Sequence, residues 1–412
     1  MYLTKKFSKE LKIIRKEPIL LVTLPAALFF LIILYPLKKI ILIRFGFIHS
    51  DRIGHFAMNT ELSILEDIKN KNNSFLDLYY FGGKICNTFL AKKWTEKLYV
   101  LPRIFIRPFS LISRRLSFFK HNIAGSTLSS DNDVLNLIEK YSQQLSLSEE
   151  ENKKGYDILK KVGVPKSAKI ICLIVRDEGY LNKIYGLKQK YHDFRNMKIN
   201  DFELGIKELI KSGFYVFRMG NYTYSKLNIK HKRYLDYSKS KIRSDFMDIF
   251  LGSKCFFCVS TNTGFDAIPW IFRRPILYIG SLPIGIFSTN TKKIMVSSKI
   301  HYSLPKKRNY KLKEIFSNNI AYSLEGEEFK YSKVKLKKPT KIEIKNTMID
   351  MIDYVKNNFT LKKKYKKKNK LFWQKYLNFY KQYPPKKPIH GKIKCVISPS
   401  FLKKHQEWLL ND

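Results

Sequence analysis

The sequence predicts an α/β protein with two halves, each containing a parallel sheet covered by helices. Short apolar runs such as "IICLIV" at 170–175 end at charged or polar residues and are typical of buried strands. Helix, strand, loop, helix and strand follow one another across 244–280, and this alternation favours a parallel sheet. The chain has 412 residues, of which 44% are hydrophobic, so it can build two or three domains.

Residues 1–38 are expected to form a membrane-associated helical anchor. Residues 1–17 combine a helical apolar stripe with six basic residues, the pattern of a helix in a membrane interface. Residues 19–37 are uncharged and come close to the length that crosses a hydrocarbon core of about 30 Å. A spanning helix would put the rest of the chain outside the cytoplasm. Pro25 and Pro36 favour instead a kinked, re-entrant or monotopic anchor, and both alternatives stay open.

Residues 39–160 are expected to form an N-terminal Rossmann-like domain. The run "IILIRFGFI" at 40–48 reads as a strand, and the polar turn "HSDRIGH" at 49–55 follows it. A helix is expected to open at Asn59, Thr60 and Glu61, with Glu61 in its first turn as a cap partner. A strand that delivers a basic, Gly-containing turn into a helix start is suited to a polar or anionic ligand.

Two further segments complete the predicted organisation. Residues 161–330 should form a C-terminal Rossmann-like domain. Residues 331–412 change in composition, with a Lys run at 361–370 followed by "LFWQKYLNFYKQY". We expect this extension to be helical and to pack back on the N-terminal domain, although Lys with interleaved aromatics is also typical of surfaces that bind nucleic acid or membranes. The stripe consists of Phe372, Tyr376, Phe379 and Tyr383.

The charge and the cysteines narrow the class of protein. A formal charge of +44, mostly from Lys, favours an anionic membrane surface, an anionic substrate or nucleic acid as partner. Five scattered cysteines make no disulfide framework, and a reducing compartment fits them best. "CFFC" at 255–258 has the spacing of a redox or zinc pair, but it lies in an apolar run, so we interpret it as two core cysteines.

Candidate functional residues follow the predicted strands, because ligands of such sheets bind beyond the carboxyl ends of the strands. Arginines and a hydroxyl-rich helix start would together hold a pyrophosphate. Ser244 and Asp245 read first as a helix cap, and Asp245 is kept as a donor-side candidate. The strand-end candidates are Arg52, Gly54 and His55 after the first strand, Arg176 and Asp177 after the second, Arg218 and Gly220, and finally Ser260, Thr261, Thr263 and Gly264.

Several common site types are absent from the sequence. There is no Walker lysine loop, no GxGxxG and no nucleophile elbow, which argues against simple NTPases, dehydrogenases and α/β-hydrolases. "DND" at 131–133 has a carboxylate spacing that can bind a metal–nucleotide, but it lies in a Ser-rich linker away from any strand end. We therefore expect no metal and no other cofactor.

An ordered set of motifs resembles a family of bacterial surface-polysaccharide glycosyltransferases over roughly residues 18–330. A looser likeness connects "VRDEGY" and the segment up to "STNTG" with the donor-binding half of GT-B fucosyltransferases, although Ile174 stands where that pattern has a His. The motifs are "RIGHFAMNTE" (52–61), "LIVRDEGY" (173–180), "FRNMKINDF" (194–202), "FYVFRMG" (214–220), "DYSKSKIRSDFMDIFLGSKCFF" (236–257) and "STNTGFDAIPWIFRRP" (260–275).

The resemblance implies a GT-B-like enzyme with two Rossmann-like domains and an active site in the cleft between them. Residues 39–160 would then be the acceptor-side domain and residues 161–330 the domain that binds the donor. It places Arg176 on the donor phosphate, with Ser260, Thr261, Thr263 and Gly264 closing the donor loop. Arg52 and His55 would face the reacting sugar, Gly54 would permit close backbone approach, and His55 would be the base, with Glu61 as a rival.

The resulting hypothesis is a membrane-associated glycosyltransferase on the cytoplasmic face of the bacterial inner membrane. It would use a nucleotide sugar, a glycan or glycolipid acceptor such as capsule or O-antigen, and an anionic membrane surface, with no specific nucleic acid as partner. The alternatives are a basic RNA- or DNA-binding protein and a non-catalytic, membrane-tethered assembly protein. Salt-sensitive RNA binding would favour the first alternative, and hydrolysis of a nucleotide sugar would exclude both.

Overall fold

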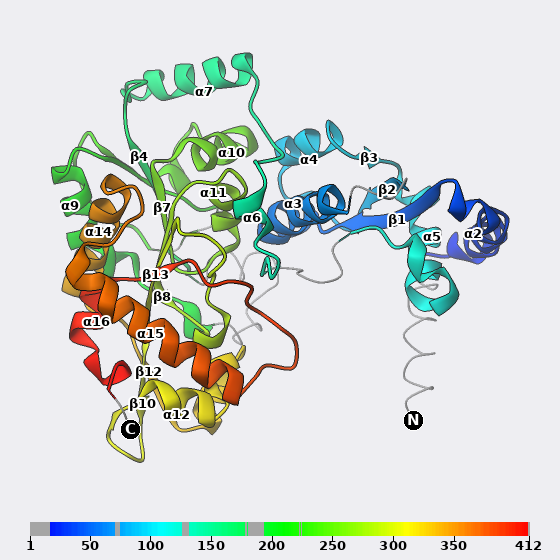
Figure 1. The fold of residues 1–412 in the computed structure, drawn as a ribbon. Helices are drawn as coiled ribbons and strands as arrows, with labels where there is room; N and C mark the ends of the chain where they lie inside the picture. The colour runs from blue at the N-terminus through cyan, green and yellow to red at the C-terminus, as the bar shows by residue number, and fades with distance from the viewer. Residues whose placement is uncertain are drawn as a thin grey trace. The chain divides into compact units, whose positions relative to one another are not determined.

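The computed structural model describes residues 17–70, 75–125, 132–177, 179, 193–221, 223 and 225–410. The chain divides into two compact units, residues 1–130 and residues 131–412. Each unit contains a parallel sheet with helices around it (Figure 1), which confirms the predicted α/β class. The helix predicted within 1–17 lies outside the described residues, apart from Glu17.

The first unit is built on a parallel sheet in which β2 lies between β1 and β3. Strand β1 pairs with β2 along its whole length, and it confirms the strand predicted at 40–48. The elements of this part are β1 (Leu42–Ile48), α3 (Ile53–Lys69), β2 (Phe75–Phe81), α4 (Thr88–Thr95), β3 (Tyr99–Val100), α5 (Arg103–Arg115) and the 3₁₀ turn η2 (Ser117–Asn122).

The apolar stretch at 19–37 folds as helix α2 (Leu20–Leu34) and the 3₁₀ turn η1 (Pro36–Lys39). Helix α2 buries Ala27 and Leu31 in an apolar cluster that also contains Phe45 of β1 and Ile106 of α5. Its other faces carry exposed apolar side chains. Among the helices of the described residues, none is both long enough and apolar enough to cross a membrane.

A partly buried ion-pair network holds β1, β2 and α3 together, and the sequence analysis did not anticipate it. Arg44 of β1 donates two hydrogen bonds of 2.6 Å to Asp77 of β2 and one of 2.6 Å to Asp67 of α3. The hydroxyl of Tyr79 donates to Asp77 at 3.1 Å. Burial raises the pKa of Asp67 to about 7, against the opposing effect of Arg44. The network therefore fixes the register of the first sheet with charge as well as with backbone hydrogen bonds.

The second unit contains, within the described residues, a seven-stranded sheet in the order β13-β9-β8-β7-β4-β5-β6. All neighbouring strands pair in parallel. Ile171 and Val259 of the sheet pack in one apolar cluster with Ile206 of α9 and Met348 of α14. The strands are β4 (Ile170–Ile174), β5 (Tyr215–Arg218), β6 (Tyr234–Leu235), β7 (Phe257–Ser260), β8 (Ile276–Ser281), β9 (Ile294–Ser298) and β13 (Val396–Ile397).

Helices cover this sheet, and a smaller antiparallel sheet follows β9. In the small sheet β10 lies between β11 and β12. Its strands are β10 (Ile300–Ser303), β11 (Arg308–Asn309) and β12 (Val334–Lys337). The helices of the unit are α6 (Leu137–Lys140), α7 (Glu149–Lys161), α9 (Glu203–Lys211), α10 (Asp245–Lys254), α11 (Ala267–Ile271), α12 (Leu312–Ser317), α13 (Gly326–Tyr331), α14 (Lys341–Lys356), α15 (Lys363–Gln382) and α16 (Pro399–Lys404).

The boundary between the units lies about thirty residues before the predicted position at 160, because α6 and α7 pack within the second unit. Asp133 accepts hydrogen bonds from the backbone N–H groups of Leu137 and Ile138 and from the side chain of Asn290. In α7, a Cβ atom added at Gly155 would lie 2.2 Å from the ring of Phe250, so the two helices α7 and α10 approach closely there. The contacts with Asn290 and Phe250 join residues that are distant in the sequence, which local patterns do not reveal.

The cysteines behave as the sequence predicts. Cys255 and Cys258 are fully buried, and Cys258 lies opposite Cys172 in the paired strands β7 and β4. All five cysteines are free thiols. No cluster of His, Cys, Asp or Glu suited to a metal occurs in the described part of the chain. The "CFFC" motif therefore belongs to the core of the second sheet.

Three of the four aromatic residues in the stripe of the C-terminal extension are buried within the second unit, and Tyr383, at the end of α15, is partly buried. Phe372 and Tyr376 of α15 are 0% exposed, and Phe379 is 9% exposed. The ring of Tyr376 lies 5.3 Å from that of Phe316 in α12, and its hydroxyl donates to the carbonyl of Ile284 at 3.0 Å. The extension was expected to pack on the N-terminal domain, but the partners found for its stripe belong to the second unit. The burial of these rings also removes them as stacking platforms for nucleic acid bases.

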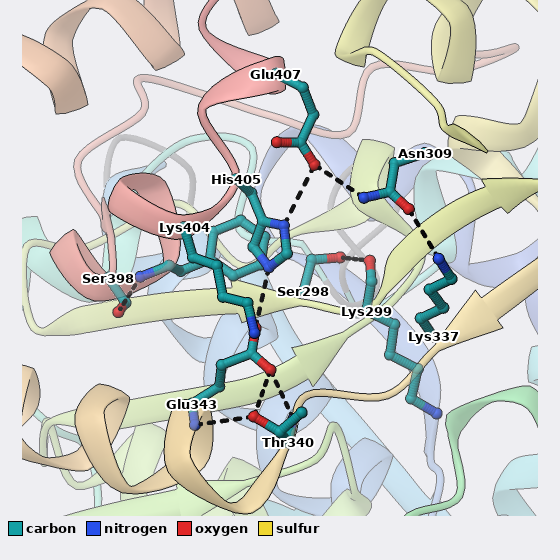
Figure 2. Close-up of polar contacts among 11 residues, drawn as sticks. Ser298, Lys299, Asn309, Lys337, Thr340, Glu343, Ser398, Lys404, His405 and Glu407 are labelled. Carbon is teal, nitrogen blue, oxygen red and sulfur yellow. Dashed lines mark hydrogen bonds and ion pairs between the residues drawn. The ribbon is translucent and has the colours of Figure 1, made fainter.

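A polar cluster, which we name the C-terminal clamp, joins α14, the segment after α16 and the small sheet (Figure 2). Glu343 of α14 accepts hydrogen bonds from Thr340, Lys404 and His405. Glu407 accepts from Asn309 of β11 at 3.1 Å and lies 3.3 Å from Nδ1 of His405. Burial alone would lower the pKa of His405, but its contacts with the two glutamates raise it above the ordinary value. The clamp thus fixes the end of the chain with charge.

Candidate functional site

The strongest candidate site lies at the carboxyl ends of β4 and β7, where two loops are joined by hydrogen bonds. The backbone N–H of Arg176, just beyond β4, donates to Oγ1 of Thr261 at 2.8 Å. The N–H of Thr261 donates in return to the carbonyl of Ile174 at 3.3 Å. Arg176 and the loop from Ser260 to Gly264 were both predicted as donor-binding elements. The structure brings these two elements together as neighbours at one edge of the sheet.

The loop after β7 is organised by Asp266, a residue that the sequence analysis missed. Its Oδ2 atom accepts a 2.6 Å hydrogen bond from the hydroxyl of Ser260 and a 2.9 Å bond from the N–H of Thr263. Burial raises the pKa of Asp266 to about 6, while these hydrogen bonds and the charges of Arg195 and Arg176 act in the opposite direction. The hydroxyl of Ser260 is therefore engaged inside the protein, and Ser260 shapes the loop.

The tip of the same loop is better placed to meet a ligand. Asn262 adopts a left-handed backbone conformation with φ of 60°, a conformation in which short polar side chains are enriched. Its Oδ1 atom is buried and accepts no hydrogen bond within the described residues. Gly264 opens a single 3₁₀ turn, η6 (Gly264–Asp266), which continues into the short helix α11. The expected helix start is thus present at Gly264, but the helix behind it is short.

Two further basic residues, Arg195 and Lys299, gather at this edge of the sheet. Lys299 follows β9 and is 1% exposed, and its Nζ atom donates to the carbonyls of Phe194 and Asn196 at 2.6 and 3.0 Å. Burial, together with the charges of Lys338, Arg176 and Arg195, lowers the pKa of Lys299 to about 7. A site at which several cations gather favours an anion as ligand. We name Arg176, Arg195 and Lys299 the cationic cluster.

Arg218, the third predicted arginine, has its partners inside the protein. It is 1% exposed, and it donates to the carbonyl of Ser225 and, at 3.2 Å, to Asp236. A second guanidinium nitrogen lies 3.9 Å from Asp177. The prediction gave Arg218 a role on the donor, whereas its contacts give it the role of a buried ion-pair partner that positions the residues after β4 and β5.

Asp245 lies where the sequence predicted a helix start. Ser244 is the N-cap of α10, and its hydroxyl accepts the N–H of Met247 at 3.2 Å. The more buried acid of this turn is Asp248, which accepts a 2.8 Å hydrogen bond from Tyr237 and has its pKa raised to about 6 by burial. The capping interpretation of Ser244 and Asp245 is confirmed, and the donor role of Asp245 stays a prediction.

In the first unit, the loop after β1 differs from the expected one. Helix α3 begins at Ile53 with Arg52 as its N-cap, six residues earlier than the predicted start at Asn59. Gly54 and His55 therefore lie in the first helical turn, and the loop itself is 49–51. The ring of His49, which the sequence analysis passed over, lies 5.7 Å from the ring of His55. Two imidazole rings therefore lie near each other, one in this loop and one in the helical turn that follows it.

Glu61 lies in the interior of α3, more than two turns from its start, and it is 0% exposed. It cannot be the first-turn cap partner that was predicted, and its burial disfavours it as the rival base. Asp133, in the linker "DND", caps the start of α6 with both of its oxygens, so it is committed to the protein. Asp131 lies outside the described residues.

An open pocket of about 660 Å³ lies beside the C-terminal clamp. Its lining contains none of the residues predicted as functional. The lining residues are Arg308, Asn309, Lys311, Lys404, His405 and Glu407.

Comparisons with known proteins give limited information. No family model matches the chain, and no curated protein matches it either. Two solved structures are similar. The Escherichia coli ADP-heptose LPS heptosyltransferase II is 14% identical with a TM-score of 0.37, and the match covers 62% of this chain and 90% of that chain. A family 9 glycosyl transferase from Veillonella parvula is 9% identical with a TM-score of 0.35, and the match covers 62% of this chain and 86% of that chain. Neither similarity is close enough to establish a shared fold or activity.

Proposed function

We propose that this protein is a glycosyltransferase that moves a sugar from a nucleotide-activated donor to a bacterial surface glycan. The observation that carries the proposal is the cationic cluster at the carboxyl edge of the second sheet, next to the loop that Asp266 organises. This edge is where parallel sheets of the doubly wound kind bind their ligands. The ordered motifs that resemble surface-polysaccharide glycosyltransferases supply the reaction class.

In this mechanism the second unit binds the leaving group. Arg176 and Arg195 hold the diphosphate with charge-assisted hydrogen bonds, and the loop tip at Asn262 and Thr263 contacts the donor. As the bond between the sugar carbon and the diphosphate oxygen breaks, the electron pair stays on the diphosphate, where these cations stabilise it. No metal takes part, so transfer should continue in EDTA. Activity that EDTA abolishes and manganese or magnesium restores would contradict this.

The first unit supplies the base in the proposed reaction. His55 accepts the proton of the acceptor hydroxyl while the acceptor oxygen bonds to the sugar carbon, and Arg52 orients the sugar or acceptor. His49, close to His55, can tune or share that proton. The acceptor class is a bacterial capsule, O-antigen or related glycan, and the reaction takes place on the cytoplasmic side of the membrane, where nucleotide sugars are made.

The decisive experiment compares Arg176→Ala with His55→Ala. Loss of the Arg176 contact should weaken the binding of a nucleoside diphosphate by about 1.5–3 kcal/mol in calorimetry. His55→Ala should leave that affinity nearly unchanged and lower turnover by about 10² to 10⁴. Arg308→Ala, at an exposed ion pair of the small sheet, and His231→Ala, at an exposed position before β6, are matched controls that should change neither quantity.

Circular dichroism must first show that all four variants are folded. If Arg176→Ala binds the nucleotide like wild type, the donor site is misplaced. If His55→Ala keeps full turnover, the loop after β1 is structural. Salt-sensitive binding of generic RNA without any affinity for nucleotide sugars would favour the nucleic-acid alternative instead.

A further inference from the structure

Helix α2 carries more apolar surface than the first unit buries. Leu21 and Val22 are 61% and 70% exposed, and Phe29 and Phe30 are 62% and 53% exposed. The one polar side chain of the helix is Thr23, whose hydroxyl donates to the carbonyl of Ile19 one turn back. A helix that is apolar on every side is normally enclosed by protein or lipid. The outer side of α2 therefore requires an apolar environment that the described part of the unit does not supply.

A second apolar strip lies next to α2. Helices α2 and α5 pack side by side (Figure 1). On α5, Phe105 is 65% exposed and Ile104 is 45% exposed, and in η2 Phe118 is 57% exposed. Phe118 stacks on Tyr35, directly after α2, with ring centroids 4.3 Å apart. The exposed apolar area thus extends over two helices that the sequence separates by about seventy residues.

Basic residues dominate the border of this area. Neither 18–41 nor 99–125 contains an acidic residue, whereas Lys38 and Lys39 lie in η1 and Arg114 and Arg115 are the last two residues of α5. Arg103 and Arg107 form ion pairs with Glu17, and these pairs attach the start of α2 to α5. The sequence before residue 17 adds six further basic residues. An apolar area with a mainly basic border, at which the carboxylate of Glu17 is paired with two arginines, is complementary to an anionic lipid bilayer.

The geometry favours a helix that lies along the membrane surface. The 15 residues of α2 rise about 22 Å, less than the roughly 30 Å of a hydrocarbon core. The packing of α2 against α5 and the sheet residue Phe45 would have to break for α2 to enter the core alone. A helix in the interface can keep that packing and still insert its exposed side chains between lipid headgroups.

We propose that α2, η1, α5 and η2 form one monotopic docking surface for an anionic lipid bilayer. Phe29, Phe30 and Phe105 insert into the interface, and Lys38, Lys39 and Arg115 contact lipid phosphates. This docking surface would hold the enzyme beside a membrane-bound acceptor, and in that role the inference rests on the proposed function. Lipid binding is nevertheless measurable without donor or acceptor, so its failure is distinguishable from a failure of the transferase proposal.

The test is flotation of the full chain with vesicles of phosphatidylcholine alone or with added phosphatidylglycerol. Wild type should float with the anionic vesicles, and salt at about 0.5 M should weaken that binding, because the Debye length is then only about 4 Å. The triple variant Phe29→Ser, Phe30→Ser, Phe105→Ser should bind on the order of tenfold or more weakly. The matched control is Leu371→Ser with Leu377→Ser on α15, residues 38% and 36% exposed, and it should bind like wild type.

A second variant keeps the test decisive if the triple variant is unstable. Lys38→Glu with Lys39→Glu should weaken binding to anionic vesicles and leave binding to neutral ones unchanged. Equal flotation of the triple variant and wild type would overturn the proposal. So would a concentration-dependent dimer that the triple variant abolishes while wild type ignores both vesicles, because a second copy would then be the occupant. If a folded Lys38→Glu, Lys39→Glu variant floats with anionic vesicles like wild type, the proposed contact of these lysines with lipid phosphates is wrong.

Discussion

Helices α2 and α15 were the two segments for which the sequence suggested a surface role, and they behave in opposite ways. Helix α15 has a charged face and an aromatic stripe, and its Phe372 and Tyr376 are completely buried. Helix α2 has no charged face, and its Phe29 and Phe30 are more than half exposed. A polar face next to an apolar stripe therefore marked a helix that packs on its own unit. A helix without a polar face has apolar surface left over after packing.

The largest effect expected from this comparison is at Tyr376. Its ring is enclosed by aromatic neighbours, and its hydroxyl contacts Ile284 and His390. Tyr376→Ala should lower the free energy of unfolding by about 3–5 kcal/mol, since it leaves a cavity and unsatisfied polar partners. Denaturant titration should show this, with Leu377→Ala on the same helix as control at less than about 1 kcal/mol. A small loss at Tyr376 would mean that the stripe is only loosely packed.

A second prediction concerns the pH dependence of stability that two histidines of this C-terminal region, His390 and His405, should cause. Burial lowers the pKa of His390 to about 4, so its stabilisation is present above its ordinary value of 6.5 and is lost as the pH falls from 6.5 towards 4. The loss should be on the order of 2–3 kcal/mol. The pKa of His405 is raised, so its stabilisation is complete below the ordinary value and is lost as the pH rises through the raised pKa.

Unfolding midpoints measured from pH 4 to pH 9 should show both slopes. His390→Gln should reduce the fall of the unfolding midpoint at acid pH and leave the alkaline range unchanged. His405→Gln should reduce the fall at alkaline pH and leave the acid range unchanged. An unchanged acid slope in His390→Gln would assign the acid sensitivity to other groups. Helix α2 should contribute nothing to this pH dependence of stability, because it contains no titratable side chain.

The smallest effect is expected on α2. Phe29→Gln should change the free energy of unfolding by less than about 0.5 kcal/mol in the absence of lipid, since the side chain is 62% exposed. The same substitution should reduce aggregation of the detergent-free protein, because it removes part of an exposed apolar area. A large loss of stability would show that Phe29 has a protein partner, and the contrast with α15 would then disappear.

The sequence was sufficient for the strands and for the edge where the candidate site lies. Buried strands such as Ile170–Ile174 are continuous apolar runs, and the polar residues that follow them, Arg176 among them, must lie at one edge of a parallel sheet. The start of α3 was missed because Arg52 stands at its N-cap position. The side chain of Arg52 makes no capping hydrogen bond, so the sequence gives no capping signal directly before Ile53.

Other features depended on distant contacts that carry no local signal. Asp266 acquires its importance from Ser260 and Thr263 folding around it. Lys299 could not stand out in a sequence so rich in Lys, and only its burial distinguishes it. Arg218 satisfied the strand-end rule yet found its partners inside the protein, because Asp236 comes from the next strand region along the chain.

Strand β13 has a consequence for how the protein is made. Val396 and Ile397 pair with Met295 and Val296 of β9, so the edge of the large sheet is completed by residues that are translated about a hundred positions later than the strand they cover. Until they emerge from the ribosome, β9 presents unpaired backbone groups to the cell, and such an edge can pair with other nascent chains. A variant in which Val396 and Ile397 can no longer pair with β9 would therefore keep every predicted donor residue and still expose a sheet edge that is prone to aggregation.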